Sequence, residues 1–131
     1  MNGLLQWTGV ALVAFIAVPA SGAGMSDALV LHGKGESPES LAELVDTLRR
    51  ENVIVAAPEM PWSSRRLYDR SVPEVDAEID KAVAELRVHE AARVYVIGQG
   101  VGGSYALRYG SRPGVNGIVA IAPDHAPESP R

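Results

Sequence analysis

Short runs of apolar residues alternate along this chain with stretches in which apolar and polar positions repeat with a helical period. The apolar runs cover residues 28–32, 53–57, 93–97 and 117–122. Neighbouring residues within each run are apolar and do not alternate with polar ones, which is typical of strands buried on both faces of a parallel sheet. Strands separated by helical stretches favour the same α/β arrangement.

Three helices are predicted between these strands. The first follows Ser37 and Pro38, which suit an N-cap and a first helical turn. Its apolar positions recur at i, i+3, i+4 and i+7, at Leu41, Leu44, Val45 and Leu48. The second begins with the capping-box pattern of Ser71 and Glu74. Its apolar stripe consists of Val75, Ile79, Val83 and Leu86. A short third helix is predicted over residues 103–110.

These elements predict an α/β fold, a three-layer sandwich with a mostly parallel sheet of about four strands and helices on both faces. The expected sheet order is 53–57, 28–32, 93–97, 117–122, with the second and third of these in the centre. All loops that follow strands then lie at one rim, where open α/β sheets bind ligands. The strand over residues 117–122 is an unpaired edge, which favours self-association.

The N-terminal segment has the layout of a secretory signal. Residues 1–26 contain no charged side chain, and the apolar run Val10–Val18 is followed by Pro19 and small residues. We therefore predict a signal peptide over residues 1–23, a domain over 24–131, and a secreted or periplasmic protein. The run is shorter than the ~20 residues that a spanning helix needs, so no stable membrane span is expected after cleavage. An uncleaved anchor, or a cytoplasmic protein that starts at Met25, are the open alternatives.

Composition narrows the classes of function. A length of 131 residues indicates one domain, and the lack of cysteine excludes disulfides and thiolate metal sites. The net charge of −4 argues against nucleic-acid binding, which requires a basic surface. His89 has no partner at a metal-ligand spacing, and no metal site is predicted.

The most informative stretch is VYVIGQGVGGS, over residues 94–104. Gly98, Gly100 and Gly103 match G-x-G-x-x-G, the phosphate-binding turn of dinucleotide folds, and Asp124 follows Gly103 by 21 residues as a candidate ribose ligand. The stretch also matches G-x-S-x-G, the nucleophile elbow of hydrolases, with glycine at the nucleophile position. The dinucleotide turn normally opens its domain, whereas this one lies in the third strand–helix unit, which favours the elbow.

Several motifs in the same order resemble the α/β-hydrolase superfamily, in particular its serine esterase and lipase-like members, over residues 27–127. LVLHGKG resembles the segment that supplies an oxyanion donor, VIGQGVGG resembles the elbow, and GIVAIAP resembles the strand after it. The resemblance implies the front half of that fold and no cofactor. It also implies backbone oxyanion donors at Lys34 and Val101. His32 would support the oxyanion loop, or alternatively be a satisfied core histidine.

The sequence departs from this family at two points. Gly100 stands at the nucleophile position and has no oxygen to attack a carbonyl. The strands that carry the acid and the histidine of the family have no counterpart, so the domain is expected to be incomplete at its C-terminus. Asp124 and His125 lie at the correct rim as a candidate relay, or are plain loop residues. We therefore expect a catalytically impaired protein of serine-esterase type that retains ligand binding.

The long loop after residues 53–57 contains candidate ligand-binding side chains, namely Trp62, Arg65, Arg66 and Tyr68. Its arginines are able to hold a small acyl or anionic ligand through paired hydrogen bonds, over a floor made by the tryptophan. Alternatively, the loop is solvated and its arginines pair with acidic neighbours, namely Glu59, Asp69 and Glu74. Two other functions stay open: a dinucleotide-binding module, and a non-catalytic interaction subunit that uses the open sheet edge.

Overall fold

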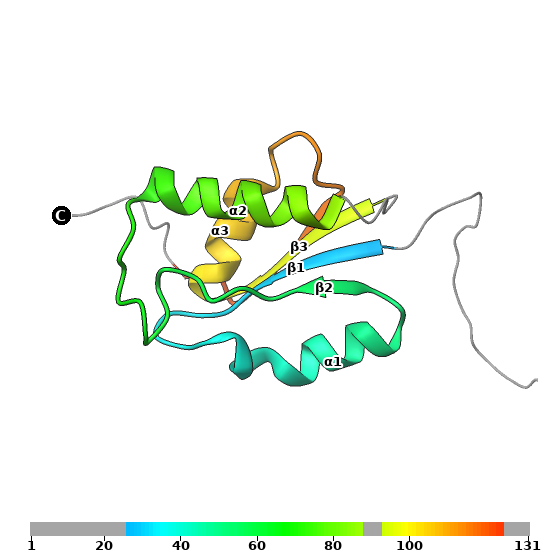
Figure 1. The fold of residues 1–131 in the computed structure, drawn as a ribbon, viewed down its shortest axis with the longest axis horizontal. Coiled ribbons are helices and arrows are strands. Elements are labelled where there is room, and N and C mark those ends of the chain that lie inside the picture. Colours follow the sequence, from blue (N-terminus) through cyan, green and yellow to red (C-terminus); the bar gives the residue numbers. More distant parts are fainter. Residues whose placement is uncertain (1–25, 88–92, 125–131) are drawn as a thin grey trace, which may run out of the picture.

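The computed structural model of this protein describes residues 26–87 and 93–124 (Figure 1). The predicted signal peptide lies outside these residues, as do His89 and His125. The elements in chain order are β1 (Ser26–Leu31), the 3-10 helix η3 (Pro38–Leu41), α1 (Ala42–Arg50), β2 (Ile54–Ala56), α2 (Val72–Arg87), β3 (Arg93–Gln99), α3 (Val101–Tyr109) and β4 (Gly117–Ile121).

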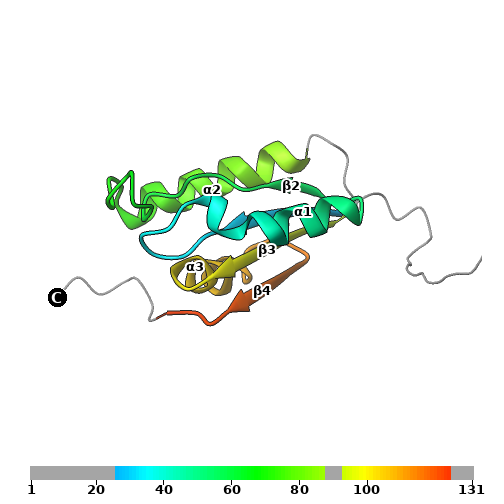
Figure 2. The same ribbon diagram turned by 90° about the horizontal axis from the view of Figure 1, so that it is seen from below.

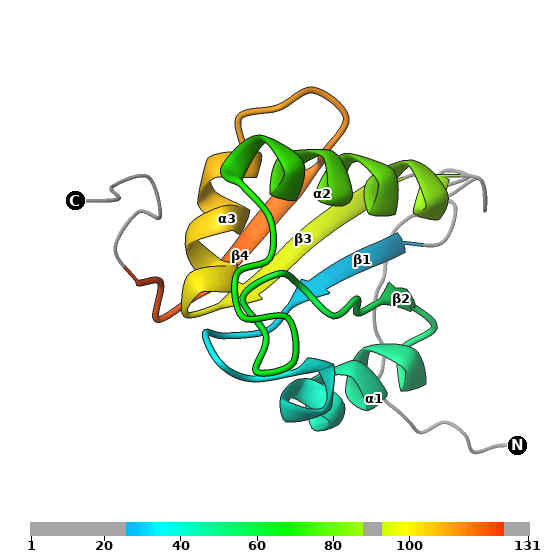
Figure 3. The ribbon, with the colours of Figure 1, turned by 60° about the vertical axis from the view of Figure 1, so that its left-hand side comes forward.

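The four strands form one parallel sheet in the order β2-β1-β3-β4, which confirms the predicted order. Leu29 in β1 is level with Ala56 in β2 and with Val96 in β3, and Val96 is level with Ile118 in β4. Because the strands are parallel, their carboxyl ends meet at one rim. Figure 3 shows the loops that leave these strands gathered on that side of the sheet.

Helices cover the sheet on both faces, with α2 and α3 on one face and α1 on the other (Figures 2 and 3). The side chains of β1 divide the core accordingly. Leu29 and Leu31 belong to the apolar cluster beneath α2 and α3, whereas Ala28 and Val30 belong to the cluster beneath α1. All four are at most 2% exposed, so this strand is buried on both faces, as its continuous apolar run predicts. The α/β sandwich is therefore confirmed.

The N-terminal caps of two helices differ in part from the predicted caps. Ser37 is the N-cap residue of η3, but its side chain makes no capping hydrogen bond, and the helix opens as a 3-10 turn before α1. At α2, the backbone N–H of Ser71 donates to Glu74 Oε2 at 3.1 Å, and the Ser71 hydroxyl donates to the same oxygen at 2.6 Å. The hydroxyl thus binds the carboxylate of Glu74, so the structure forms the glutamate half of the capping box.

An ionic cluster joins α2 to α3. Asp76 is 8% exposed and accepts hydrogen bonds from Arg108 Nη2 at 2.8 Å and from Arg112 Nη2 at 3.0 Å. The Tyr109 hydroxyl donates to Asp80 on the next turn of α2. The Arg108 guanidinium, through its hydrogen bond and its charge, holds the pKa of Asp76 below its usual value. This cluster fixes the position of α3, the helix that begins at the glycine-rich turn.

We expect Asp76→Asn to lower the free energy of unfolding by about 1–3 kcal/mol at pH 7, because hydrogen bonds to a charged partner become neutral ones. The depressed pKa means that the folded chain binds this proton more weakly than the unfolded chain does. The stabilisation is therefore complete above the unfolded pKa of about 3.9 and is lost as the pH falls through the lower folded pKa. Urea unfolding of both proteins at pH 7 and pH 3 measures this, and an equal difference at the two pH values would contradict it.

In the part of the chain that the structure describes, every helix is too short or too polar to cross a membrane.

Candidate functional site

The turn from β3 into α3 is a sharp elbow centred on Gly100. This residue is the N-cap of α3, with φ 58° and ψ −125°, the conformation of the first central residue of a type II′ turn, which glycine adopts readily and L side chains avoid. Its N–H donates to Ile121 O at 3.0 Å. Its carbonyl accepts from Ser104 N at 3.1 Å and from Asp124 N at 3.2 Å. The end of β4 and the first turn of α3 therefore hold the elbow from both sides.

The residues on either side of the elbow have no room for a side chain. A Cβ at Gly98 would overlap the carbonyl of Gly102 and lie 2.7 Å from Gly103 N. A Cβ at Gly102 would overlap Leu31 O and lie 2.6 Å from His32 O. The closest contacts are therefore at Gly98 and Gly102, and Gly102 is outside the G-x-G-x-x-G dinucleotide pattern. A Cβ at Gly103, which is inside that pattern, would be less crowded, at 3.0 Å from Gly98 O.

Position 100 faces the loops that follow β1 and β4. A Cβ at Gly100 would lie 3.4 Å from Asp124 Oδ2 and 3.6 Å from Gly33 Cα, which are ordinary contact distances. The backbone of Asp124 is held in place, because its carbonyl accepts a 2.6 Å hydrogen bond from the Ser104 hydroxyl. The structure thus places Asp124 beside the elbow, at the rim where it was predicted. The other residue of the candidate relay, His125, lies outside the described residues.

His32 supports the loop after β1 from within the core. The side chain is 1% exposed, its Nδ1 lies 2.9 Å from Gly33 O, and its Nε2 lies 3.0 Å from Met60 N. Since the Met60 N–H donates to Nε2, the ring proton is on Nδ1 and is donated to Gly33 O. His32 is therefore a satisfied core histidine, and its hydrogen bond to Gly33 O joins it to the loop after β1. Sequence analysis did not identify Met60 as its partner.

The loop itself is a tight turn around Lys34. Glu36 N donates to Gly33 O at 3.2 Å, and Gly35 has φ 70°, which together define a type II turn with Lys34 at its first central position. The carboxylate of Glu36 accepts a 3.2 Å hydrogen bond from Gly33 N. Within residues 26–87 and 93–124, neither Lys34 N–H nor Val101 N–H donates to a protein acceptor. The two predicted oxyanion donors, in the turn after β1 and at the first residue of α3, are thus not used by other described residues.

Trp62 is part of the core and does not line an open surface. It is 1% exposed, and its ring stacks on Tyr105 of α3 with a centroid separation of 4.7 Å and an interplanar angle of 10°. Its Nε1 donates to His32 O at 2.7 Å, and its carbonyl accepts from Gly35 N at 2.9 Å. Trp62 therefore fixes the loop after β1 against α3.

The arginines of the long loop are paired with acidic side chains, which confirms the alternative prediction for them. Arg65 pairs with Glu59 and, at 3.3 Å, with Glu39. Arg66 forms a two-pronged pair with Glu78, with a shortest distance of 2.7 Å, and a 2.9 Å pair with Asp69. The hydrogen bonds that Arg66 donates to Glu78, followed by those that it donates to Asp69, raise the pKa of Arg66. A further pair joins Arg70 and Glu74 at 3.8 Å. An anionic ligand would have to compete with these carboxylates.

Tyr68 lies in an exposed turn of this loop. Tyr68 and the preceding Leu67 both have positive φ, 62° and 52°, and both are exposed. The Tyr68 N–H donates to Pro61 O at 2.6 Å, which fixes the turn. Partial burial and, after it, the charge of Asp124 raise the pKa of Tyr68. Of the four predicted ligand-binding side chains, the tyrosine is the one whose pKa responds to the charge of Asp124.

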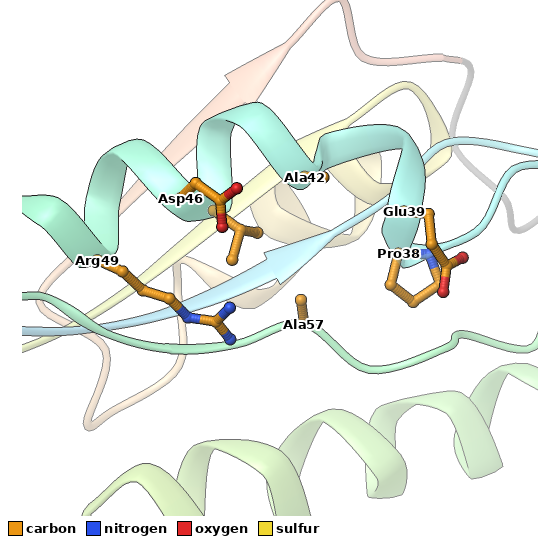
Figure 4. Close-up of a pocket in the computed structure, with 7 residues that line it drawn as sticks. Pro38, Glu39, Ala42, Asp46, Arg49 and Ala57 are labelled. Atoms are coloured by element: carbon orange, nitrogen blue, oxygen red, sulfur yellow. The ribbon is translucent and has the colours of Figure 1, made fainter.

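A cavity of about 230 Å³ lies elsewhere, between the first turns of the η3–α1 segment and the end of β2 (Figure 4). Its lining consists of Pro38, Glu39, Ala42, Val45, Asp46, Arg49 and Ala57. It is separated from the elbow by β1, because it adjoins the edge strand β2 while the elbow follows β3. Its charged groups are of both signs and indicate no single ligand class.

The described residues contain no group of three or more His, Cys, Asp or Glu side chains that is able to hold a metal ion. No protein-family model matches this sequence, and no curated protein matches it.

Proposed function

We propose that this protein is an α/β-hydrolase-like protein of serine-esterase type that binds a small neutral acyl compound at the Gly100 elbow without hydrolysing it. The observation that carries this proposal is the backbone of Gly100, which has φ 58° and ψ −125° and stands in sequence between the crowded glycines Gly98 and Gly102. A nucleophile elbow needs this strained turn in order to present a side chain at position 100. With the predicted signal peptide, the domain would act outside the cytoplasm.

The absence of turnover follows from the groups around the elbow. Gly100 has no side-chain oxygen to form an acyl-enzyme. Ser104 is 6% exposed, and its hydroxyl donates to Asp124 O, so this oxygen is buried and already engaged. Both ring nitrogens of His32 are engaged by backbone groups, so this histidine is not positioned as a general base.

The expected ligand is a neutral acyl group such as an ester. The N–H of Lys34 lies in the turn that begins at Gly33, and the N–H of Val101 begins α3 directly after position 100; both suit a carbonyl oxygen, which accepts hydrogen bonds. Asp124 Oδ2, 3.4 Å from the Cβ position at Gly100, disfavours an anion at the same place. The paired state of Arg65 and Arg66 also disfavours an anion. A pyrophosphate would meet the same obstacles, so the elbow geometry supports the acyl ligand over a dinucleotide.

Two variants of Lys34 test the proposal, because they separate its backbone from its side chain. Proline is favoured at the first central position of a type II turn, so Lys34→Pro keeps the turn and removes one N–H donor. Lys34→Ala is the matched control that keeps the donor. We expect methyl butyrate to bind the wild-type chain weakly and Lys34→Pro about tenfold more weakly, with Lys34→Ala close to wild type.

Titration with methyl butyrate, followed through the backbone amide resonances of Gly33, Gly35 and Val101, which all three proteins retain, measures these affinities. Butyrate is the anionic comparison, and p-nitrophenyl butyrate measures turnover, which we expect to equal that in buffer. Equal affinities of the two Lys34 variants would contradict the role of the donor. Hydrolysis well above buffer, or the absence of any methyl butyrate binding, would reject the proposed function.

A further inference from the structure

Exposed apolar side chains gather around β4. Val119 and Ile121 on this strand are 49% and 41% exposed, and Leu107 on α3 is 52% exposed. The strand itself, with the sequence GIVAI, contains no charged residue. β4 is an edge of the sheet, so the backbone groups on its outer side have no strand partner within the described residues. Natural edge strands are commonly protected by charges, proline or a covering element, and β4 has no charge or proline.

Val119 and Ile121 lie on the sheet face that α1 covers only in part. Val30, Ile97 and Val119 are level with one another on β1, β3 and β4, so their side chains share a face. Val30 and Ile97 belong to the cluster beneath α1, whereas Val119 does not. Figure 2 shows α1 beside β1 and β2, with β4 on the far side of β3. The outer part of this face is therefore open.

Leu107 extends the apolar region to the other side of the β4 edge. The next residue, Arg108, reaches Asp76 on α2. Successive residues on a helix are about 100° apart, so Leu107 lies on the flank of α3 that is turned from α2. The same helix packs on β4, because a Cβ at Gly110 would lie 3.0 Å from Ile118 Cγ2. Apolar groups therefore border the free edge both above and below the sheet.

We infer that the β4 edge binds the β4 edge of a second copy of this chain. Because β4 has no charged residue, two copies of it do not repel each other through like charges. For the same reason, β4 offers no charge that would favour an oppositely charged partner. A two-fold axis through Val119 makes the strands antiparallel, with Ile121 opposite Gly117 of the second copy. Large and small residues then face each other, and the Tyr95 ring, 3.1 Å from the Cβ position at Gly117, provides an apolar surface for Ile121.

The opposite edge of the sheet limits this association to a dimer. β2 has only three residues, and the Arg49 side chain donates to Val55 O at 3.4 Å. Short edge strands pair poorly with further chains. A two-fold contact uses both copies of the β4 edge, so the assembly closes with one sheet across two chains. The inference does not depend on what binds at the Gly100 elbow.

The oligomeric state of the purified full chain tests this inference. Sedimentation equilibrium is expected to show a monomer–dimer equilibrium with a dissociation constant on the order of 10–100 µM, as suits a small interface. Val119→Lys should weaken dimerisation at least about tenfold, because two lysines would face each other on the axis. Leu67→Lys is the matched control, since Leu67 is 76% exposed but lies on the rim loop. It should dimerise like the wild type.

Amide hydrogen exchange of the wild-type chain provides a second measurement that needs no variant. Exchange over Gly117–Ile121 should slow as the protein concentration rises, while exchange at Leu67 and Tyr68 stays constant. A wild-type monomer at 1 mM, concentration-independent exchange in β4, or growth into larger assemblies would overturn the inference. A Val119→Lys protein that dimerises like the wild type would do so as well.

Discussion

Replacing Gly102 by alanine is expected to lower the free energy of unfolding by about 3 kcal/mol or more, enough to unfold a marginally stable domain. The new Cβ would overlap Leu31 O and lie 2.6 Å from His32 O. Both are backbone atoms at the end of the central strand β1. Relief of the overlap would therefore require α3 to move away from the sheet, which would also disturb the elbow.

Two other glycines are matched controls for this substitution, because they separate steric overlap from backbone strain. At Gly100 the φ of 58° is unfavourable for alanine, but the Cβ would be 3.4 Å from its nearest neighbour, so we expect a loss of about 1–3 kcal/mol. At Gly35, with φ 70° and no heavy atom within 4 Å, we expect about 1 kcal/mol. Urea unfolding followed by circular dichroism gives all three values. The steric explanation fails if Gly102→Ala is no more destabilising than Gly35→Ala, and a gain of stability in Gly100→Ala would reject the strain at the elbow.

Removal of the Trp62 side chain should have the second largest effect, a loss of about 3–5 kcal/mol in Trp62→Ala. The ring is 1% exposed and stacked on Tyr105, and its Nε1 donates to His32 O. Alanine would leave a cavity between the loop after β1 and α3, and would leave the His32 carbonyl without this donor.

The variant Trp62→Phe divides this effect into its parts. Phenylalanine keeps an aromatic ring against Tyr105 but loses the hydrogen bond to His32 O, so we expect a loss of about 1–3 kcal/mol. Because Trp62 O also accepts from Gly35 N, the alanine variant should speed amide exchange at Gly35 well beyond the phenylalanine variant. Denaturant unfolding and amide exchange measure the two effects. A loss below about 1 kcal/mol in Trp62→Ala would show that the indole is not a structural link.

The elbow was predictable from sequence in its position but not in its shape. The spacing of Gly98, Gly100 and Gly102 after a buried strand matches a strand–turn–helix, and two overlapping patterns fit the same letters. The choice between them depends on which glycines are sterically required. Whether a glycine is sterically required at position 102 depends on its contacts with Leu31 and His32, which are distant in sequence. The local sequence therefore does not reveal it.

The long loop illustrates the opposite outcome. Trp62, Arg65, Arg66 and Tyr68 have the residue types of a ligand site, yet three of them are engaged within the protein: the indole in the core, and the guanidinium groups with carboxylates. Partners such as Glu39 on η3 and Glu78 on α2 are distant in sequence. Sequence alone identifies groups able to bind an anion, whereas only the fold shows that other residues of the same chain already bind them.

The sequence by itself determined the layout of this protein. Continuous apolar runs require strands buried on both faces, and helical stretches between them require parallel connections, which together predict the observed parallel α/β sheet. Only the tertiary structure decided the conformation at Gly100, the core position of Trp62, and the exposure of Val119 and Ile121 at the edge. The physical reason is the separation in sequence of the residues involved. Periodic burial can be recognised from residues that are close in sequence. Steric overlap, ion pairing and coverage of a sheet face depend on residues that only folding brings together.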